Sequence, residues 1–307
     1  MNGILIVDKP QGMTSHAVVG RVRRLFGLRK VGHAGTLDPL ATGVLVVALG
    51  QATRILQFLM EENKTYRASL LLGKATDTQD SEGQVVSSQE TSHLGKDQII
   101  AACASMIGSF EQMPPMYSAL KKDGVPLYKL ARKGIEVSRV ARPVTIFSLE
   151  QLTVQSPSVT FDVCCSKGTY VRTLCHDIGV KLGCGAHLTA LRRLQSAPFT
   201  DKDAVTLDEL ERTAPEHRRN FLLSIGEALR DYPSLAVSDE GMKRLGFGIP
   251  PTTDMILGPI GLDEGTLVLL VSSKGPLAMT RYAPSRENES RGDFELLKVF
   301  NDGGGFE

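Results

Sequence analysis

The chain has 307 residues, of which 42% are hydrophobic and 22% charged, so it has room for about two domains and is neither wholly disordered nor collagen-like. Its 35 basic and 34 acidic side chains exclude a polycationic protein of the histone type. The longest apolar runs, such as residues 43–50, fall well short of the ~20 residues that cross a membrane. The N-terminus has no basic region before an apolar run, and the five cysteines include no C-x-x-C pair. We therefore expect no signal peptide and a reduced, cytoplasmic protein without disulfide or zinc frames.

The balanced total hides an uneven distribution of charge along the chain. Residues 1–60 carry a net charge of +5 and residues 121–200 carry +7, whereas residues 61–120 carry −4 and residues 201–307 carry −7. If the two positive segments share one face, that face attracts phosphates although the chain is nearly neutral. Ordinary solvation of helices by Lys and Arg explains the same counts equally well.

The chain mixes strands and helices without the regular rhythm of a parallel sheet. The predicted elements are, in chain order, a strand over 3–7, a helix over 14–26, a glycine-rich connection over 31–43, a strand over 43–49, a helix over 53–60, a strand over 66–72, a polar loop over 73–95, a helix capped by Asp97 and ending near 107, a turn-rich segment over 113–143, strands over 144–154 and 159–165, a helix over 169–182, and strands over 265–271 and 295–300. We predict an α+β fold with a largely antiparallel sheet. After about residue 231 the pattern predicts a small β domain of about 75 residues.

Sequence motifs for the common cofactors are absent. The chain contains no phosphate-binding P-loop, no dinucleotide-binding G-x-G-x-x-G after a strand, no H-E-x-x-H and no G-x-S-x-G. Cys184 and His187 lie three positions apart, but one such pair is more typical of a buried thiol than of a metal site. We therefore expect chemistry that uses the chain's own side chains.

Residues 32–43 combine glycines, a proline and one carboxylate just ahead of a predicted strand. Gly35 permits positive φ and close approach of the backbone. Pro39 restricts Asp38 to an extended or turn conformation, so this carboxylate projects from a fixed backbone. A carboxylate held in this way acts as a nucleophile or a general base. An ordinary Asp-Pro turn, in which Asp38 accepts hydrogen bonds from nearby amides, is the simpler alternative.

Two further segments supply candidate partners for that carboxylate. Tyr170 and Arg172 are predicted in the first turn of a helix that follows a strand. A guanidinium offers a carboxylate a bidentate fork and lowers its pKa, and Tyr170 offers a rigid ring with a hydroxyl. Tyr66 begins a strand and is an aromatic that can stack on a base. A structural ion pair for Arg172 and a half-buried strand position for Tyr66 remain alternatives.

The order of these segments along the chain is specific. They read Asp8-Lys9-Pro10 with Gly12, Thr14 and Ser15, then Gly32-His33-Ala34-Gly35-Thr36-Leu37-Asp38-Pro39 with Ala41-Thr42-Gly43, then Lys64-Thr65-Tyr66-Arg67, then Gly73 with Thr76-Asp77-Thr78 and Asp80, then Ser166-Lys167-Gly168-Thr169-Tyr170-Val171-Arg172, then Gly183-Cys184-Gly185-Ala186-His187-Leu188 and Leu191-Arg192-Arg193-Leu194. Over residues 3–200 this set closely resembles the TruB family of bacterial tRNA pseudouridine synthases, and the resemblance extends more loosely to the end.

The resemblance implies a fold, a reaction and a partner. Residues 1–230 would form the pseudouridine synthase domain, with an RNA-gripping insertion over 113–143, and residues 231–307 a PUA-like RNA-binding domain. The family converts uridine 55 in the T-loop of tRNA to pseudouridine without metal, nucleotide or redox cofactor. The implied partner is the T-arm of tRNA, and we expect a monomer without membrane association or an obligate protein partner. The net charge of residues 201–307 departs from the basic face of an RNA-binding domain.

The resemblance also implies a role for each matching residue. Asp38 matches the catalytic aspartate, and Arg172 would pair with it. Tyr66 would stack on the target base and accept a ribose proton if a glycal intermediate forms. The other implied substrate-binding residues are His33 near the flipped nucleotide, Tyr170 and Leu191 lining the uracil pocket, and Lys9 supporting the site. Asp77 and Asp80 would shape a nearby loop, for which a plain acidic turn is an equal alternative.

Three other functions remain open on the sequence. The same grooves suit a non-catalytic protein that binds or folds tRNA. A guide-dependent pseudouridine synthase of the archaeal and eukaryotic branch is a second alternative, although the insertion over 113–143 favours a stand-alone enzyme. A hydrolase with Asp38 as its base is the third, and it would release free uracil.

Overall fold

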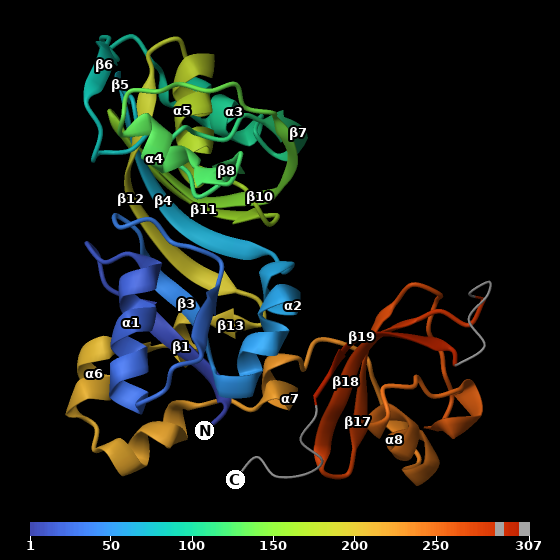
Figure 1. The fold of residues 1–307 in the computed structure, drawn as a ribbon. Coiled ribbons are helices and arrows are strands. Elements are labelled where there is room, and N and C mark those ends of the chain that lie inside the picture. The colour runs from blue at the N-terminus through green and yellow to red at the C-terminus, as the bar shows by residue number, and fades with distance from the viewer. Residues whose placement is uncertain (286–291, 301–307) are drawn as a thin grey trace.

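The computed structural model describes residues 1–285 and 292–300, which form one large sheet, one small sheet and two short ribbons (Figure 1). The strands are β1 (Gly3–Lys9), β2 (Val31–Ala34), β3 (Thr42–Leu49), β4 (Lys64–Leu72), β5 (Lys74–Thr76), β6 (Val85–Ser88), β7 (Gly108–Gln112), β8 (Lys121–Lys122), β9 (Val125–Pro126), β10 (Arg142–Gln155), β11 (Ser158–Cys165), β12 (Ala186–Ser196), β13 (Phe199–Thr200), β14 (Val205–Thr206), β15 (Ser234–Val237), β16 (Ile256–Leu257), β17 (Leu267–Ser272), β18 (Gly275–Tyr282) and β19 (Phe294–Val299). The helices are α1 (Ser15–Phe26), α2 (Leu56–Met60), α3 (Lys96–Ala104), α4 (Leu127–Ala131), α5 (Val171–Lys181), α6 (Leu207–Arg212), α7 (Ile225–Ala228) and α8 (Asp239–Gly246), with 3-10 turns over Gly50–Ile55, Asp201–Asp203, Pro215–Phe221 and Thr253–Met255.

The large sheet has ten strands in the order β14-β1-β3-β12-β4-β11-β10-β7, with β2 beside β3 and β13 beside β12. Its neighbouring strands are antiparallel except at β1–β14 and β3–β12, which are parallel. A separate five-stranded sheet, β16-β15-β17-β18-β19, follows near the C-terminus. The predicted α+β class, with a largely antiparallel mixed sheet and a C-terminal sheet domain, is confirmed.

Capping residues place α1 where the sequence predicts it. Thr14 accepts a hydrogen bond from the backbone N–H of Ala17 (3.1 Å), and Gly27 ends the helix at a φ of 63°. The prediction for α3 is wrong at both ends. Gly95 rather than Asp97 is the N-cap, because its backbone N–H donates to the side chain of Gln98 (2.9 Å), and the helix ends at Ala104.

Several segments contain strands that the pattern does not predict, among them β2 in the predicted connection over 31–43 and β7 before the turn-rich segment. Residues 73–95, predicted as a loop, include the ribbon β5–β6, and all four residues of β6 are exposed. No apolar alternation marks such a strand. The sequence also gives no strand over β12, which pairs with β4 from Ala186 to Ser196 and carries a buried arginine in its middle.

The two halves of the large sheet meet at a narrow parallel joint. Between β3 and β12 the paired residues are Thr42 with Arg192 and Gly43 with Arg193. Gly43 has a φ of 95°, and a Cβ there would overlap the backbone of Arg193. Glycine is therefore required at this position both by conformation and by the close approach of the two strands.

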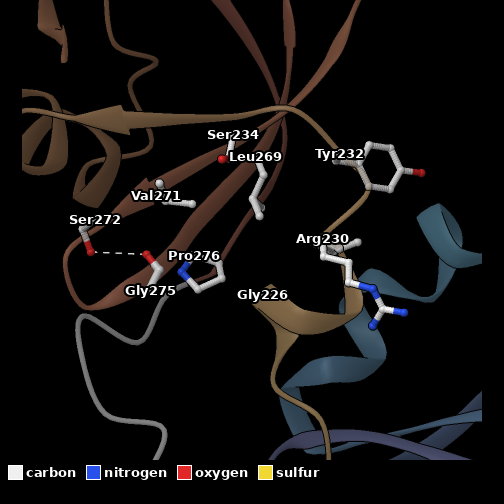
Figure 2. A pocket seen from close by; sticks show the side chains of 10 residues that line it. Gly226, Arg230, Tyr232, Ser234, Leu269, Val271, Ser272, Gly275 and Pro276 are labelled. Atoms are coloured by element: carbon white, nitrogen blue, oxygen red, sulfur yellow. Dashed lines mark hydrogen bonds between the residues drawn. The ribbon is translucent and has the colours of Figure 1, made fainter. Parts of the chain in front are cut away.

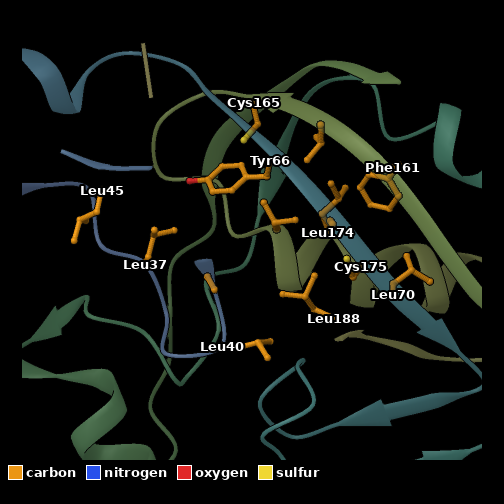
Figure 3. Close-up of a cluster of buried hydrophobic side chains, with 14 of the residues drawn as sticks. Leu37, Leu40, Leu45, Tyr66, Leu70, Phe161, Cys165, Leu174, Cys175 and Leu188 are labelled. Carbon is orange, nitrogen blue, oxygen red and sulfur yellow. The ribbon is translucent and has the colours of Figure 1, made fainter. Parts of the chain in front are cut away.

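Helix α5 is fixed against the sheet by an apolar stripe. Val171, Leu174, Cys175 and Ile178 repeat at helical spacing and are buried. Figure 3 shows Leu174 and Cys175 beside Leu70 of β4. Burying each large aliphatic side chain contributes about 1.5–3 kcal/mol to folding. Burial of this stripe therefore holds α5 in one position against the sheet.

The C-terminal sheet shares a hydrophobic core with the large sheet. Leu269, Met279 and Phe300 belong to the same buried cluster as Ile4 and Ile6 of β1. Figure 1 shows this sheet beside α7 and α2. The second sheet therefore packs on the first through apolar side chains as well as through the connecting chain. None of the helices within residues 1–285 and 292–300 is long and apolar enough to cross a bilayer.

We predict that Gly43→Ala destabilises the fold by about 3 kcal/mol or more, because a positive φ for alanine costs ~1–2 kcal/mol and overlap at a packed position adds a similar amount. Gly27→Ala is the matched control, since its φ is also positive but nothing lies within 4 Å of the added Cβ. Urea unfolding measures both free energies. Equal losses for the two variants would contradict the close approach of β3 and β12.

Candidate functional site

The Asp38 loop connects β2 and β3 and is pinned on both sides of the aspartate. The buried Ser15 hydroxyl donates to the Leu37 carbonyl (3.1 Å) and accepts from the Leu37 N–H (2.8 Å). The carbonyl of Pro39 accepts from the N–H of Gly12 (2.8 Å). The Asp38 side chain itself keeps 39% of its surface accessible. A fixed but accessible carboxylate is the result.

Arg172, in the first turn of α5, lies between two carboxylates. One guanidinium nitrogen is 3.1 Å from an Asp38 carboxylate oxygen, and another is 3.5 Å from Asp80. The shortest bond of this guanidinium goes to the Tyr117 carbonyl (2.7 Å). Arg172 is only 5% exposed, so these contacts fix its position.

Asp80 is the carboxylate whose place the sequence did not reveal. It is 3% exposed and accepts hydrogen bonds from the Thr78 hydroxyl (2.6 Å) and the Glu82 N–H (3.0 Å). The acidic loop predicted around it is therefore folded inward at this residue. Two more acidic residues stand close to it in the sequence, and no local pattern singles it out.

Opposing effects set the ionisation of Asp38. The protein around Asp38 withdraws part of the carboxyl from water although the side chain stays partly accessible, and this desolvation raises its pKa above the ordinary value. The negative charge of Asp80 raises the pKa further. The positive charges of Arg172 and Lys9 lower it and favour the carboxylate. A carboxylate with a raised pKa is a stronger base and nucleophile than an exposed one, provided that it remains ionised.

Lys9, at the end of β1, is fully buried beneath this loop. Its ammonium donates to the carbonyls of Met13 (2.6 Å), Pro10 (2.8 Å) and Pro39 (3.4 Å). Burial lowers the pKa of Lys9 to about 8, and the charge of Asp38 opposes that effect. The three carbonyl contacts tie the turn after β1 to the Asp38 loop.

Tyr66 and Arg193 face each other across β4 and β12. The two residues are partners in the strand register, and Tyr66 is 9% exposed at the edge of the cluster in Figure 3. Burial raises the pKa of the Tyr66 hydroxyl, and the nearby Arg193 guanidinium partly offsets this. At neutral pH the ring is therefore a neutral phenol. Arg193 is a site residue for which no role was predicted, because it lies inside a strand that the sequence pattern does not predict.

His33, Tyr170 and Leu191 lie around the edge of this group. Burial lowers the pKa of His33, so its imidazole is neutral near pH 7, and its Nδ1 has no partner in the described part of the chain. The Tyr170 ring lies 5.8 Å from the Arg172 guanidinium carbon. Leu191 lies in β12, where its carbonyl accepts a long hydrogen bond from the Thr42 hydroxyl (3.5 Å). Arg172 thus contacts both Asp38 and the Tyr170 ring, and Lys9 bonds to the Asp38 loop. Tyr66 and His33 lie near Arg193, and Leu191 lies two positions before Arg193 in β12.

Two other features lie apart from this group. A hollow of about 300 Å³ separates α7 from the C-terminal sheet, and Figure 2 shows Arg230, Tyr232, Leu269 and Pro276 in its lining. Its lining contains no carboxylate, histidine or cysteine. In the described ranges no three His, Cys, Asp or Glu residues are grouped to hold a metal, and His187 Nδ1 lies 2.8 Å from the Lys74 carbonyl oxygen.

Comparisons with known proteins point to one family. The family model for the N-terminal domain of TruB family pseudouridylate synthase matches residues 23–171, and the model for the tRNA pseudouridylate synthase B C-terminal domain matches residues 172–230. The chain is 74% identical to tRNA pseudouridine synthase B of Syntrophotalea carbinolica over 99% of both chains. It is 44% identical to the protein of the same name from Geobacter sulfurreducens, over 98% of this chain and 100% of the other.

Solved structures of archaeal and related assemblies have the same fold. A chain from an archaeal box H/ACA ribonucleoprotein complex superimposes with a TM-score of 0.71 and 28% identity, over 97% of this chain and 85% of that one. A chain from an H/ACA complex bound to a substrate RNA that contains 2′-deoxyuridine gives a TM-score of 0.74 and 28% identity, over 97% and 84%.

We predict that two substitutions shift the Asp38 pKa in opposite directions. Arg172→Met removes a positive neighbour and raises the pKa, whereas Asp80→Asn removes a negative neighbour and lowers it. Carbon-13 NMR of the side-chain carboxyl groups, with Asp38→Asn to assign the signal, follows each titration. Shifts of the same sign in both variants would contradict the arrangement of charges around Arg172.

Proposed function

The chain belongs to the TruB family of pseudouridylate synthases, and from this membership we propose that it converts uridine 55 in the T-loop of tRNA to pseudouridine. Formation of pseudouridine in tRNA is the activity that its homologues support. The observation that carries the proposal to particular residues is the 3.1 Å pair of Arg172 with the accessible carboxylate of Asp38. The proposed setting is the cytoplasm, where the protein would act on tRNA as a monomer.

The isomerisation exchanges one bond to the ribose for another. The bond between C1′ and N1 breaks, the uracil turns over, and C1′ bonds to C5. The proton on C5 leaves to solvent, and N1 gains a proton, so atoms and electrons balance without an external oxidant or reductant. We assign the start of this sequence to the Asp38 carboxylate, acting as nucleophile at C1′ or as base toward the ribose, with Arg172 holding it ionised.

We assign Tyr66 to stacking against the target base. Its hydroxyl is neutral at neutral pH, since the ordinary pKa of a phenol is already about 10 and burial raises it further. If the reaction passes through a glycal, Tyr66 is the proposed acceptor of the ribose proton, which requires that its own hydroxyl proton first be passed on. A neutral ring buried at the site edge still offers a face for a base.

The uridine must leave its stack to reach Asp38. Flipping costs about a few kcal/mol, and contact of the freed base with apolar and aromatic side chains recovers part of that cost. We propose that Tyr170 and Leu191 line the uracil pocket and that the neutral imidazole of His33 contacts the flipped nucleotide or takes its place in the stack. Lys9 supports the loop from beneath, since its ammonium is fully buried.

The insertion over 113–143 is the proposed grip on the T-loop. Before β10 begins at Arg142 it carries the short elements β8, β9 and α4, and Lys121 and Lys122 are exposed on it. The Arg132 guanidinium lies 5.7 Å from the ring of Tyr128, which places a cation and an aromatic together. A folded RNA loop is recognised by shape and by stacking on such groups.

We propose further that residues 231–307 form a PUA-like unit that touches tRNA outside the T-loop. Its acidic composition requires that any RNA contact be local, for example at Lys243 near the end of α8. Because this sheet shares its core with β1, charge reversal at its surface is a cleaner test than deletion. A change in the salt dependence of tRNA binding would support the contact.

We predict that Asp38→Asn lowers the rate by about 10³-fold or more, because the amide is neither nucleophile nor base. The substrate is an unmodified tRNA transcript with tritium at uracil C5, and release of tritium is followed without metal or nucleotide. Asp208→Asn, which changes an exposed carboxylate of α6, is the matched control.

A second transcript with cytidine at position 55 tests the site of modification. The proposal is supported if the wild-type protein releases tritium from the transcript with uridine at position 55 and not from the transcript with cytidine there. Release of free uracil would instead indicate a hydrolase, and tight binding without release would indicate a protein that only binds or folds tRNA.

We predict that amides of the 113–143 insertion exchange quickly with solvent in the free protein and more slowly with tRNA bound. The physical reason is that few of its backbone groups are in regular elements before RNA covers them. Hydrogen–deuterium exchange with mass spectrometry measures both states, and β4 in the core serves as the internal reference. Equal exchange in the two states would contradict the proposed grip.

A further inference from the structure

The N-terminus of α5 has a partner outside its own loop. Tyr170 is the N-cap residue of this helix, and its side chain makes no capping bond. The amide of Gln112, the last residue of β7, instead pairs with the Tyr170 backbone at two points. Gln112 Oε1 accepts from the Tyr170 N–H (2.8 Å), and Gln112 Nε2 donates to the Tyr170 carbonyl (3.2 Å).

This pairing is buried and specific in orientation. Gln112 is 2% exposed, so loss of its bonds would leave polar groups without water. Two bonds from one planar amide fix the direction of the Tyr170 backbone as well as its distance. Only one orientation of the amide satisfies both bonds, because the donor must face the carbonyl.

Arg172 stands two residues beyond this anchored point. Its distances to the Asp38 and Asp80 carboxylates are 3.1 Å and 3.5 Å, so a small shift of the helix start would lengthen both ion pairs. The same stretch of chain touches Arg172 directly, because the Tyr117 carbonyl accepts its shortest hydrogen bond. The segment 112–117, where β7 leads into the insertion, therefore contacts the start of α5 at two points, through Gln112 and through the Tyr117 carbonyl.

We propose that Gln112 is a positioning residue for the reaction, acting on Asp38 through the start of α5 and Arg172. The inference rests on the proposed function, since it names a further requirement of the same site. The side-chain hydrogen bonds of Gln112 within the described residues go to the Tyr170 backbone and not to Asp38. Its position where β7 becomes the insertion also links the RNA-gripping segment to the catalytic arginine.

The test uses the full-length protein with two substitutions and one control. Gln112→Met keeps the length of the side chain and removes both bonds. Gln112→Glu keeps the acceptor for the Tyr170 N–H and loses the donor to the Tyr170 carbonyl. Glu111→Gln changes the exposed neighbour on the same strand and is the matched control.

Single-turnover pseudouridine formation and tRNA affinity are measured separately for each variant. We expect Gln112→Met to lower the rate by about ten- to a hundredfold, because small misplacements of a catalytic group have effects of that size. The tRNA dissociation constant should stay within about twofold, since Gln112 is buried away from solvent. Gln112→Glu should fall between Met and wild type, and Glu111→Gln should match wild type.

A purely structural role would not move the pH profile. In Gln112→Met, Arg172 lies farther from Asp38, so the pKa of Asp38 rises. The fall of the rate at acidic pH, where Asp38 becomes protonated, should therefore begin at a higher pH. The proposal is overturned if that variant keeps the wild-type rate and acid limb. It is also overturned if the rate falls only in step with tRNA affinity.

Hydrogen exchange at residues 170–174 tests the anchoring without any assay of activity. We expect faster exchange there in Gln112→Met than in wild type, and unchanged exchange would overturn the proposal. If the wild-type protein forms no pseudouridine, the proposed function fails, and the exchange result still decides whether Gln112 anchors α5.

Discussion

A single buried guanidinium holds the catalytic loop and the sheet together. Arg193 is 1% exposed, and in the described residues it has no carboxylate within ion-pair distance. Its Nε donates to the Val44 carbonyl (2.6 Å), and another nitrogen donates to the Gly35 carbonyl (3.1 Å). Gly35 and Val44 lie on either side of the segment that carries Asp38. One side chain from β12 therefore fixes both ends of that segment at the place where the two halves of the sheet meet.

The charge of Arg193 also affects several ionisable neighbours. Arg193 lowers the pKa of His33 and Lys9 and reduces the rise at Tyr66. A charge without a carboxylate partner in the interior is costly, and the hydrogen bonds to the Val44 and Gly35 carbonyls partly offset the loss of water. The positive charge of Arg193 favours a neutral His33, whereas the charges of Arg172 and Lys9 favour an ionised Asp38. Structure and chemistry at this site thus depend on the same guanidinium.

The sequence predicted the elements whose packing is local and missed those defined by distant partners. Helix α1 followed from apolar spacing and its caps, and Asp38 followed from the glycines and proline that fix its backbone. The strand β12 did not, because Arg193 in its middle contradicts the apolar pattern of a buried strand. Asp80 and Gln112 gave no local signal either. Their roles come from contacts with Arg172 and Tyr170, which lie 92 and 58 positions away.

The shared core of the two sheets has a consequence for synthesis on the ribosome. Ile4 and Ile6 emerge among the first residues, but Leu269, Met279 and Phe300, which cover the same cluster, are made last. At about 5–20 residues per second the part of the cluster that these three residues cover stays exposed for roughly 13–60 s. Other members of the cluster, such as Phe58, Phe199 and Ile225, are made earlier and are available to cover the rest of it, so the exposed apolar surface is the part that the last strands conceal. A polypeptide truncated before the last strands would therefore expose apolar surface and be prone to aggregation rather than form a smaller active enzyme.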